Sequence, residues 1–235
     1  MDIMTFLTLN NKGLITAVLL GLLLLFLDNF KLIFLLFMLY FLSLSAIATF
    51  VGKEKKEKLG VYDKARGIPN VLSNSGGPVL MAFAFFIANA TNHQYAAILF
   101  LIGFASSVAA ITSDKFSSEI GVLDGMPISI ISRKRVKKGV SGAVTMLGFG
   151  AGLFAALAVG LPFALVFLHG LMPSSTAVYY LYTSLSIAIG GFFGSFADSI
   201  FGYFEDQGSG NKFTSNLICG VFGGFFGILV FVLII

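Results

Sequence analysis

The chain has 235 residues, of which 57% are hydrophobic and 11% are charged, and its formal net charge is +4. Its mean hydropathy of +0.95 excludes a soluble globular protein, because the apolar runs are unbroken and long enough to cross a bilayer. There is room for about seven spans of roughly 20 residues and for little else. We therefore expect one all-α, polytopic membrane domain over residues 1–235.

Seven apolar runs, taken in chain order, predict the transmembrane helices. They are Leu14–Leu27, Leu32–Val51, Asn70–Ala90, Tyr95–Ile120, Gly142–Leu168, Thr176–Tyr203 and Phe213–Ile235. The first run is short, but no small-residue cleavage site follows it, so we interpret it as a span rather than a signal peptide. Glycines spaced four apart in the last three runs, such as Gly190 and Gly194, let helices approach closely. They predict a tight bundle of these three spans and leave a homo-oligomer possible.

Basic residues predict the orientation, because cytoplasmic loops carry an excess of Lys and Arg. One cluster lies between spans two and three and another lies between spans four and five. The first cluster is Lys53, Lys55, Lys56, Lys58, Lys64 and Arg66. The second is Arg133, Lys134, Arg135, Lys137 and Lys138, with Lys115 just before it. Two spans separate them, so both can face the cytoplasm, with the N-terminus inside and the C-terminus outside. Only Lys31 then lies outside. The expected protein is a multi-pass protein of the cell membrane with cytoplasmic loops at about 52–69, 121–141 and 204–212.

Three carboxylates fall near the cytoplasmic ends of these spans: Asp114 and Glu119 in span four and Asp198 in span six. Acidic residues are costly in a membrane segment and indicate function. With nearby amides and hydroxyls they make the set of hard oxygen ligands that Mg²⁺ prefers. We therefore predict all three as catalytic and metal-binding residues. Asp114 and Glu119 lie about 140° apart around a helix. Each would therefore bind its own ion, or only one of them would contact the ion directly while the other supports it. Asp114 and Ser118, in contrast, share a face.

The segment from Ser132 to Ala143 joins five cations to a glycine-bracketed helix start. Helix N-termini and neighbouring Lys or Arg side chains bind phosphates, so the combination suits phosphoryl transfer. The predicted nucleotide- and substrate-binding residues are Asn70, Asn74, Ser118, Arg133, Lys134, Arg135, Lys137, Lys138, Gly139, Ser141, Gly142, Ser199, Asn211 and Asn216. The sequence has no G-x-x-x-x-G-K-[ST] loop, which excludes a P-loop kinase. Both histidines fall on the outer side, which argues against a zinc site or a histidine nucleophile.

Each of these features also has a structural interpretation. Basic clusters commonly set topology and contact anionic lipids, interfacial Asp114 or Asp198 could cap a helix, and Asn70 and Asn74 could bond between helices. The alternative function is an ion- or proton-coupled transporter that uses the intramembrane carboxylates. A transporter needs polar groups near the midplane, whereas here they gather toward one face. A scaffold without chemistry would leave the carboxylates unexplained.

Four segments, in order along the chain, resemble motifs of the plant phytyl-phosphate kinases and their uncharacterised multi-pass relatives, which are distantly similar to phytol and dolichol kinases. The segments are Asn-Val-Leu-Ser-Asn-Ser-Gly at 70–76, Ser-Asp-Lys-Phe-Ser-Ser-Glu-Ile-Gly at 113–121, the stretch from Val136 to Gly142, and Gly-Ser-Phe-Ala-Asp-Ser-Ile-Phe-Gly at 194–202.

The resemblance implies a Mg²⁺-dependent kinase that transfers the γ-phosphoryl group of CTP, or of another nucleoside triphosphate, to an isoprenoid monophosphate and gives the diphosphate. No nucleic-acid partner is expected. The matching functional positions are Asn74, Asp114, Glu119, Gly142, Asp198 and Ser199. The sequence departs from the family pattern at two places. Asn211-Lys212 stands where Asn-Asp is common, with Asn216 displaced by one residue, and Asn70 stands where Gln is common.

Overall fold

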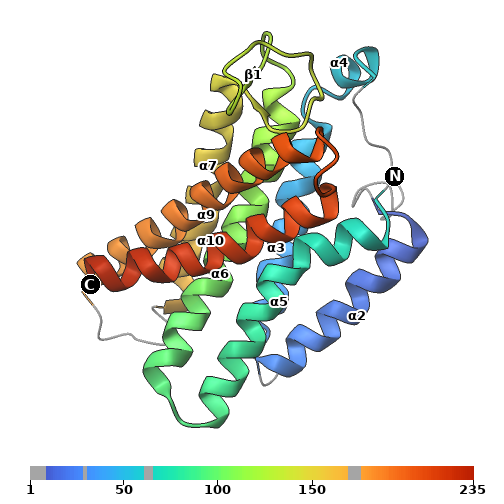
Figure 1. The fold of residues 1–235 in the computed structure, drawn as a ribbon. Helices are drawn as coiled ribbons and strands as arrows, with labels where there is room; N and C mark the ends of the chain where they lie inside the picture. The colour runs from blue at the N-terminus through green and yellow to red at the C-terminus, as the bar shows by residue number, and fades with distance from the viewer. Residues whose placement is uncertain (1–8, 29–30, 61–65, 169–175) are drawn as a thin grey trace.

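The structure is a computed structural model that describes residues 9–28, 31–60, 66–168 and 176–235, with only the backbone of 166–168. Seven apolar helices make up most of the fold (Figure 1). They are α2 (Asn11–Leu27), α3 (Ile33–Phe50), α5 (Ile68–Ala90), α6 (Gln94–Gly121), α7 (Met146–Pro162), α9 (Ala177–Glu205) and α10 (Lys212–Ile234). Six are long and apolar enough to cross a membrane, and α2 is a shorter apolar helix. The prediction of an all-α polytopic protein with about seven helices is confirmed.

Smaller elements connect these helices. A short helix, α4 (Lys53–Lys58), follows α3, and a π-helical turn, η1 (Phe163–Leu168), continues α7. Two strands of two residues each, β1 (Ile128–Ser129) and β2 (Ala143–Val144), pair antiparallel. They close residues 122–145, which we call the hairpin segment, into a compact structure between α6 and α7.

The predicted start of the fifth span was wrong by four residues. We expected a helix from Gly142, but α7 begins at Met146, and the side chain of Thr145 caps it by accepting a hydrogen bond from the Gly148 amide. Gly142 has a φ of +72°, which interrupts a right-handed helix, and Ala143 is paired in β2. The glycines of this segment therefore form a loop packed beside the helices and not a helix N-terminus.

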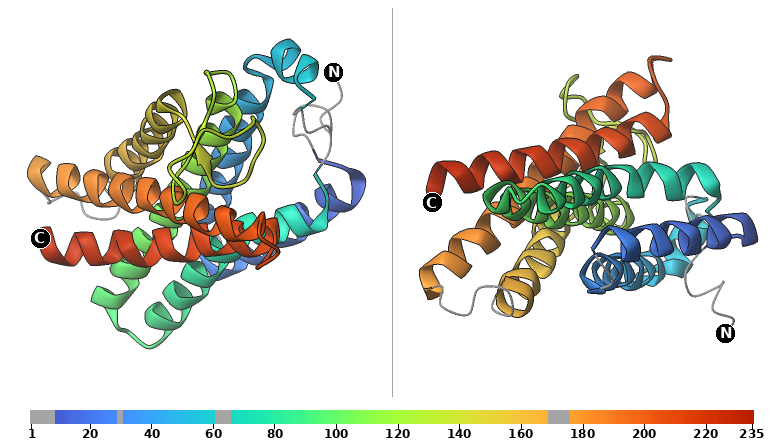
Figure 2. Two further views of the ribbon diagram at one scale, coloured as in Figure 1. Left: turned by 45° about the horizontal axis from the view of Figure 1, so that its top comes forward. Right: turned by 90° about the horizontal axis from the view of Figure 1, so that it is seen from below.

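Helix α6 occupies the centre of the bundle, where it contacts α3, α5, α7, α9 and α10. Figure 2 shows α9 and α10 side by side across it. Glycines permit this packing, since a Cβ atom at Gly190 would lie 2.6 Å from the Cα of Gly227. Gly152 packs instead against Ser117 of α6. The predicted close packing of glycine-rich helices is present, but it is organised around α6 as well as among the last three helices.

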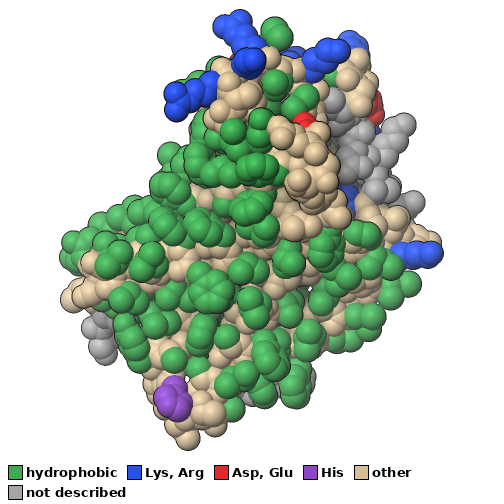
Figure 3. All heavy atoms as spheres, viewed as in Figure 1, with side chains coloured by type: hydrophobic (Ala, Val, Ile, Leu, Met, Phe, Trp, Pro, Cys, Tyr) green, Lys and Arg blue, Asp and Glu red, His purple; other side chains and the backbone are tan. Residues whose placement is uncertain are grey.

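The connections separate into two ends of the bundle. The chain around α4, the hairpin segment and the α9–α10 turn lie toward the top and right of Figure 1, whereas the α5–α6 turn and the C-terminus lie toward the lower left. The Lys and Arg side chains visible in Figure 3 gather at the top and right. We call this the polar end. The charge separation expected from the sequence is present in the fold, and the assignment of the polar end to the cytoplasm stays a prediction.

Candidate functional site

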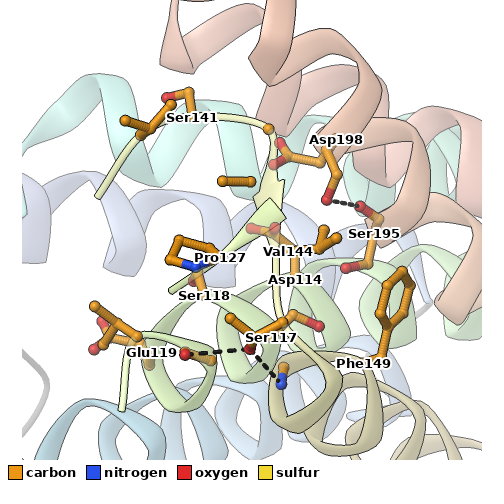
Figure 4. Close-up of a pocket in the computed structure, with 18 of the residues that line it drawn as sticks. Asp114, Ser117, Ser118, Glu119, Pro127, Ser141, Val144, Phe149, Ser195 and Asp198 are labelled. Atoms are coloured by element: carbon orange, nitrogen blue, oxygen red, sulfur yellow. Dashed lines mark hydrogen bonds between the residues drawn. The ribbon is translucent and has the colours of Figure 1, made fainter. Parts of the chain in front are cut away.

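A cavity of about 270 Å³ lies at the polar end, between α6, α7, α9 and the hairpin segment (Figure 4). Its wall brings together many of the residues predicted from the sequence. These are Asp114, Ser118, Glu119, Lys138, Gly139, Ser141, Gly142, Asp198 and Ser199. Three further polar residues that were not among the predicted site residues also line it: Ser117, Ser195 and Lys212. Residues from four separate stretches of the chain therefore meet in one cavity.

Asp114 of α6 and Asp198 of α9 lie across this cavity from each other (Figure 4). Asp198 is only 4% exposed, and its Oδ1 atom is buried without a hydrogen-bond partner among the described residues. A buried carboxylate oxygen without a partner is costly. With the second carboxylate, Asp114, lining the same cavity, it favours a bound cation.

The packing of α6 against α9 brings the two carboxylates together. A Cβ atom at Gly191 would lie 2.6 Å from the Cβ of Ala109, and one at Gly194 would lie 2.5 Å from the Cβ of Ala110. Asp114 follows Ala110 by four residues and Asp198 follows Gly194 by four, so each carboxylate lies one turn further along the same contact line. The contact between small residues thus sets the spacing of the acidic pair.

Lys212, the first residue of α10, supplies a cation to this pair. Its Nζ lies 3.3 Å from the Oδ2 of Asp198. The lysine side chain is 56% exposed, whereas that of Asp198 is 6% exposed. The amine therefore approaches from solvent and leaves the inner oxygen of Asp198 uncovered.

The loop from Gly139 to Gly142 forms the opposite wall. Gly142 touches the backbone of α9, since an added Cβ would lie 2.4 Å from the amide nitrogen of Tyr203 and 2.5 Å from the carbonyl oxygen of Ser199. The side chain of Lys138 is half-buried, and its Nζ donates a hydrogen bond of 2.9 Å to the carbonyl oxygen of Val122 and another to that of Asp124. These contacts fix the loop and one lysine against the cavity.

Glu119 has a different environment from the carboxylate pair. Its Oε2 accepts from Lys56 Nζ at 2.7 Å, its Oε1 accepts from Arg66 at 3.0 Å, and Lys115 Nζ also donates to Oε1. The Lys56 side chain is 0% exposed and also donates to the last carbonyl groups of α3, at Ala48 and Thr49. Glu119 thus ties α3, α4 and the start of α5 to the end of α6. We call Glu119 with Lys56, Arg66 and Lys115 the glutamate cluster.

The five-residue spacing explains why Glu119 is not beside Asp114. The two side chains leave α6 about 140° apart, so Asp114 faces α9 while Glu119 faces α3 and α4. In the described part of the chain, no three His, Cys, Asp or Glu side chains form a group that could hold a metal ion. A metal in this cavity would rest on the two aspartates, with hydroxyls, water and substrate oxygens completing its ligands.

Several predicted residues lie outside the cavity wall. Asn70 and Asn74 line a second, narrower cavity between α2, α3 and α5. Asn211 caps α10 by accepting from the Thr214 amide, and Asn216 is buried in α10 with its Oδ1 lacking a hydrogen-bond partner among the described residues. The exposed cations of the hairpin segment are Arg133, Lys134, Arg135 and Lys137.

From the sequence, Lys56, Arg66 and Lys115 were interpreted as basic residues that set the membrane orientation. In the structure they form ion pairs with Glu119. The spacing of Lys115 and Glu119, four residues apart on one helix, predicts that pair. No local pattern predicts Lys56 or Arg66 there, because both reach Glu119 from segments more than 50 positions away in the chain. Lys212 was noted only as a departure from the family pattern.

Comparison with known proteins adds a family and three relatives. The family described as "Integral membrane protein DUF92" matches residues 3–230. An uncharacterised membrane protein of Methanocaldococcus jannaschii is 35% identical over 230 residues, which cover 95% of this chain and 86% of that protein. No solved structure matches the chain.

Two relatives come from Arabidopsis thaliana. Protein PGR is 37% identical over 183 residues, covering 71% of this chain and 62% of PGR. The chloroplastic protein VTE6 is 30% identical over 209 residues, covering 85% of this chain and 57% of VTE6. The chain therefore spans less than two thirds of the length of either plant relative.

Proposed function

The chain belongs to the DUF92 family of integral membrane proteins, and from that premise we propose that it transfers the γ-phosphoryl group of a nucleoside triphosphate to an isoprenoid monophosphate. The observation that carries the proposal is the Asp114–Asp198 pair, which faces a cavity also lined by Lys138, Lys212 and a glycine-rich loop. Phosphoryl transfer needs little covalent chemistry from a protein and depends on positioning and charge neutralisation. This cavity offers both.

The residues present fit Mg²⁺. This ion commonly binds one or two carboxylates and keeps waters and substrate phosphates as its other ligands. The buried Oδ1 of Asp198 and the carboxyl group of Asp114, which lines the same cavity, supply such a donor set. Asp114 and Asp198 would hold the ion, with the hydroxyls of Ser195 and Ser199 lining the same cavity. Bound there, Mg²⁺ would neutralise charge on the transferred and leaving phosphates. Glu119, predicted from the sequence as a third ligand, would support the site by holding its surrounding segments in place.

The chain's own groups would perform the remaining steps. Lys138 and Lys212 would pair with phosphate oxygens, and the backbone of the 139–142 loop would form the wall of the cavity beside the triphosphate. An oxygen of the acceptor monophosphate would attack the γ-phosphorus, the bond from that phosphorus to the β-γ bridging oxygen would break, and the nucleoside diphosphate would leave. The attacking oxygen is already ionised at neutral pH, so no strong general base is required. That agrees with the absence of histidine from the described cavity wall.

Similarity to known proteins supports the acceptor class. The motifs at 70–76, 113–121 and 194–202 resemble those of plant phytyl-phosphate kinases, and the match to VTE6 covers 85% of the chain. Asp114 and Asp198 belong to two of these motifs and line the same cavity. We propose CTP or another nucleoside triphosphate as the donor and a polyprenyl or phytyl monophosphate as the acceptor.

The test is a transfer assay on purified protein in lipid nanodiscs. The protein is supplied with Mg²⁺, one of four γ-³²P-labelled ribonucleoside triphosphates, and farnesyl, geranylgeranyl or phytyl monophosphate. We expect labelled isoprenyl diphosphate from at least one pair, and none when EDTA replaces Mg²⁺. Folded protein that labels no acceptor with any nucleotide would overturn the proposal.

A further inference from the structure

The second cavity has about 60 Å³ of space and lies between α2, α3 and α5. Its lining changes character along its length. Arg66, Asn70 and Asn74 lie at one end, and Leu24, Met38 and Phe41 lie deeper. A cavity with this order of side chains fits a molecule that has an anionic head and an apolar tail.

The fold sets the direction of this cavity. The amide of Asn10, at the start of α2, donates to the carbonyl oxygen of Arg66 at 3.0 Å, so the charged end of the cavity lies at the polar end of the bundle. Leu24 is near the opposite end of α2. The apolar part of the cavity therefore runs toward the interior of the membrane, as the tail of a lipid phosphate would.

Arg66 connects this cavity with the first one. Arg66 lines the second cavity, and its guanidinium donates to Glu119, which lines the first.

We propose that the second cavity binds the first isoprene unit of the acceptor, with Arg66 and the amides of Asn70 and Asn74 at its phosphate. This inference rests on the proposed function and gives the acceptor a defined place. With about 60 Å³ of space, the cavity is too small for a whole isoprenoid tail, so only the unit next to the phosphate would enter it. The rest of the tail would pass along α2, whose other face is exposed to lipid at Ile15, Val18 and Leu22.

Photo-crosslinking tests the location independently of turnover. Protein in nanodiscs is irradiated with a geranyl monophosphate that carries a diazirine on its first isoprene unit, and the labelled peptides are mapped by mass spectrometry. We expect labels on α2, α3 or α5 around Ala17, Met38 and Val71, and competition by unlabelled farnesyl monophosphate. Competed labelling confined to other helices would overturn the location while leaving the proposed function standing. No competed labelling and no transfer activity would overturn both.

A matched pair of variants on α2 tests the same site by kinetics. Ala17 lines the cavity and the neighbouring Val18 is 55% exposed on the outer face. Ala17→Phe should raise the KM for isoprenyl monophosphate at least tenfold and leave the KM for nucleotide within twofold, whereas Val18→Phe should change neither. If Ala17→Phe does not fold, Ser45→Leu fills the same cavity from α3. Equal kinetics for the cavity-filling variant and Val18→Phe would overturn the inference.

Discussion

Lys212 and Asp198 form an ion pair across the α9–α10 turn, in which the lysine Nζ lies 3.3 Å from one carboxylate oxygen while the other oxygen is buried without a hydrogen-bond partner among the described residues. Asp114 lines the same cavity as Asp198 (Figure 4). One exposed amine thus partly neutralises a pair of acidic groups. In our account Lys212 competes with the metal for Asp198 and pairs with phosphate when the metal is bound.

This competition can be measured with Lys212→Gln. Removing the amine leaves the carboxylates to the metal, so the Mg²⁺ concentration for half-maximal turnover should fall about two- to five-fold, the range set by an ion pair of up to about 1 kcal/mol with one exposed partner. The melting temperature in EDTA should fall as well, because the acidic groups then repel each other. Lys12→Gln, a variant of an exposed lysine at the start of α2, is the control. An unchanged or higher Mg²⁺ requirement would contradict the competition.

Glu119 should matter more to stability than an exposed glutamate does. Its side chain is 11% exposed and bound by three cations, and breaking a buried ion pair by removing one partner costs about 3–5 kcal/mol. Glu119→Gln should therefore lower the melting temperature by several degrees. Glu57, which pairs with Lys53 at 3.9 Å with both side chains 45% exposed, is the control, and Glu57→Gln should have an effect within about 0.5 kcal/mol. Similar melting temperatures for the two variants would show that the glutamate cluster does not tie the helices together.

The basic side chains of the hairpin segment should separate into two kinds. Lys138 lines the cavity, so Lys138→Gln should lower kcat/KM for nucleotide by about 10- to 100-fold, as expected for charge-assisted bonds of about 1.5–3 kcal/mol. The triple variant Arg133→Gln/Lys134→Gln/Arg135→Gln removes only exposed cations. It should raise the KM for nucleotide a few-fold at low salt and very little at about 1 M salt, where screening is nearly complete.

The same kinetic comparison can contradict the expected difference between Lys138 and the exposed cations. A triple variant that loses more activity than Lys138→Gln, at all salt concentrations, would place the exposed cations on the bound nucleotide instead.

The orientation predicted from Lys and Arg can be checked by cysteine labelling in intact cells. Lys55→Cys and Lys137→Cys should react only after the membrane is permeabilised, and Asn92→Cys, in the α5–α6 turn, should react without permeabilisation. The single native cysteine, Cys219, is 1% exposed and should give little background. Labelling of Lys55→Cys and Lys137→Cys from opposite sides would remove the basis for placing the site at the cytoplasmic face.

Most of the fold follows from local sequence, whereas the misplaced start of α7 has its cause in contacts between separate segments. The apolar runs predict the six long helices and the shorter α2 of the described chain, because a bilayer requires such runs. The start of α7 was missed because the loop conformation at Gly142 and the strand pairing of Ala143 depend on contacts with α9 and β1. The length of an apolar run does not predict such contacts.

The site was predictable where spacing along one helix decides the outcome. The sequence predicts that Asp114 and Glu119 leave α6 in different directions, and in the structure Glu119 faces the glutamate cluster. The pairing of Asp114 with Asp198 was expected only from their shared leaflet and family motifs. The contacts of Lys56, Arg66 and Lys212 depend on how helices pack, which no single segment encodes.

The central claim is that Asp114 and Asp198 together bind the metal that phosphoryl transfer needs. The direct measurement is Mn²⁺ binding, followed by electron paramagnetic resonance, on wild type, Asp114→Asn, Asp198→Asn and the control Asp206→Asn, whose side chain is exposed at the end of α9. Each preparation is also assayed for Mg²⁺-dependent transfer. We expect one bound Mn²⁺ per chain in wild type and Asp206→Asn. In the other two variants we expect that binding to be lost, with kcat/KM lowered at least 100-fold, since a lost ligand removes several kcal/mol of transition-state stabilisation. Folded Asp114→Asn and Asp198→Asn proteins that bind Mn²⁺ and turn over like wild type would contradict the account.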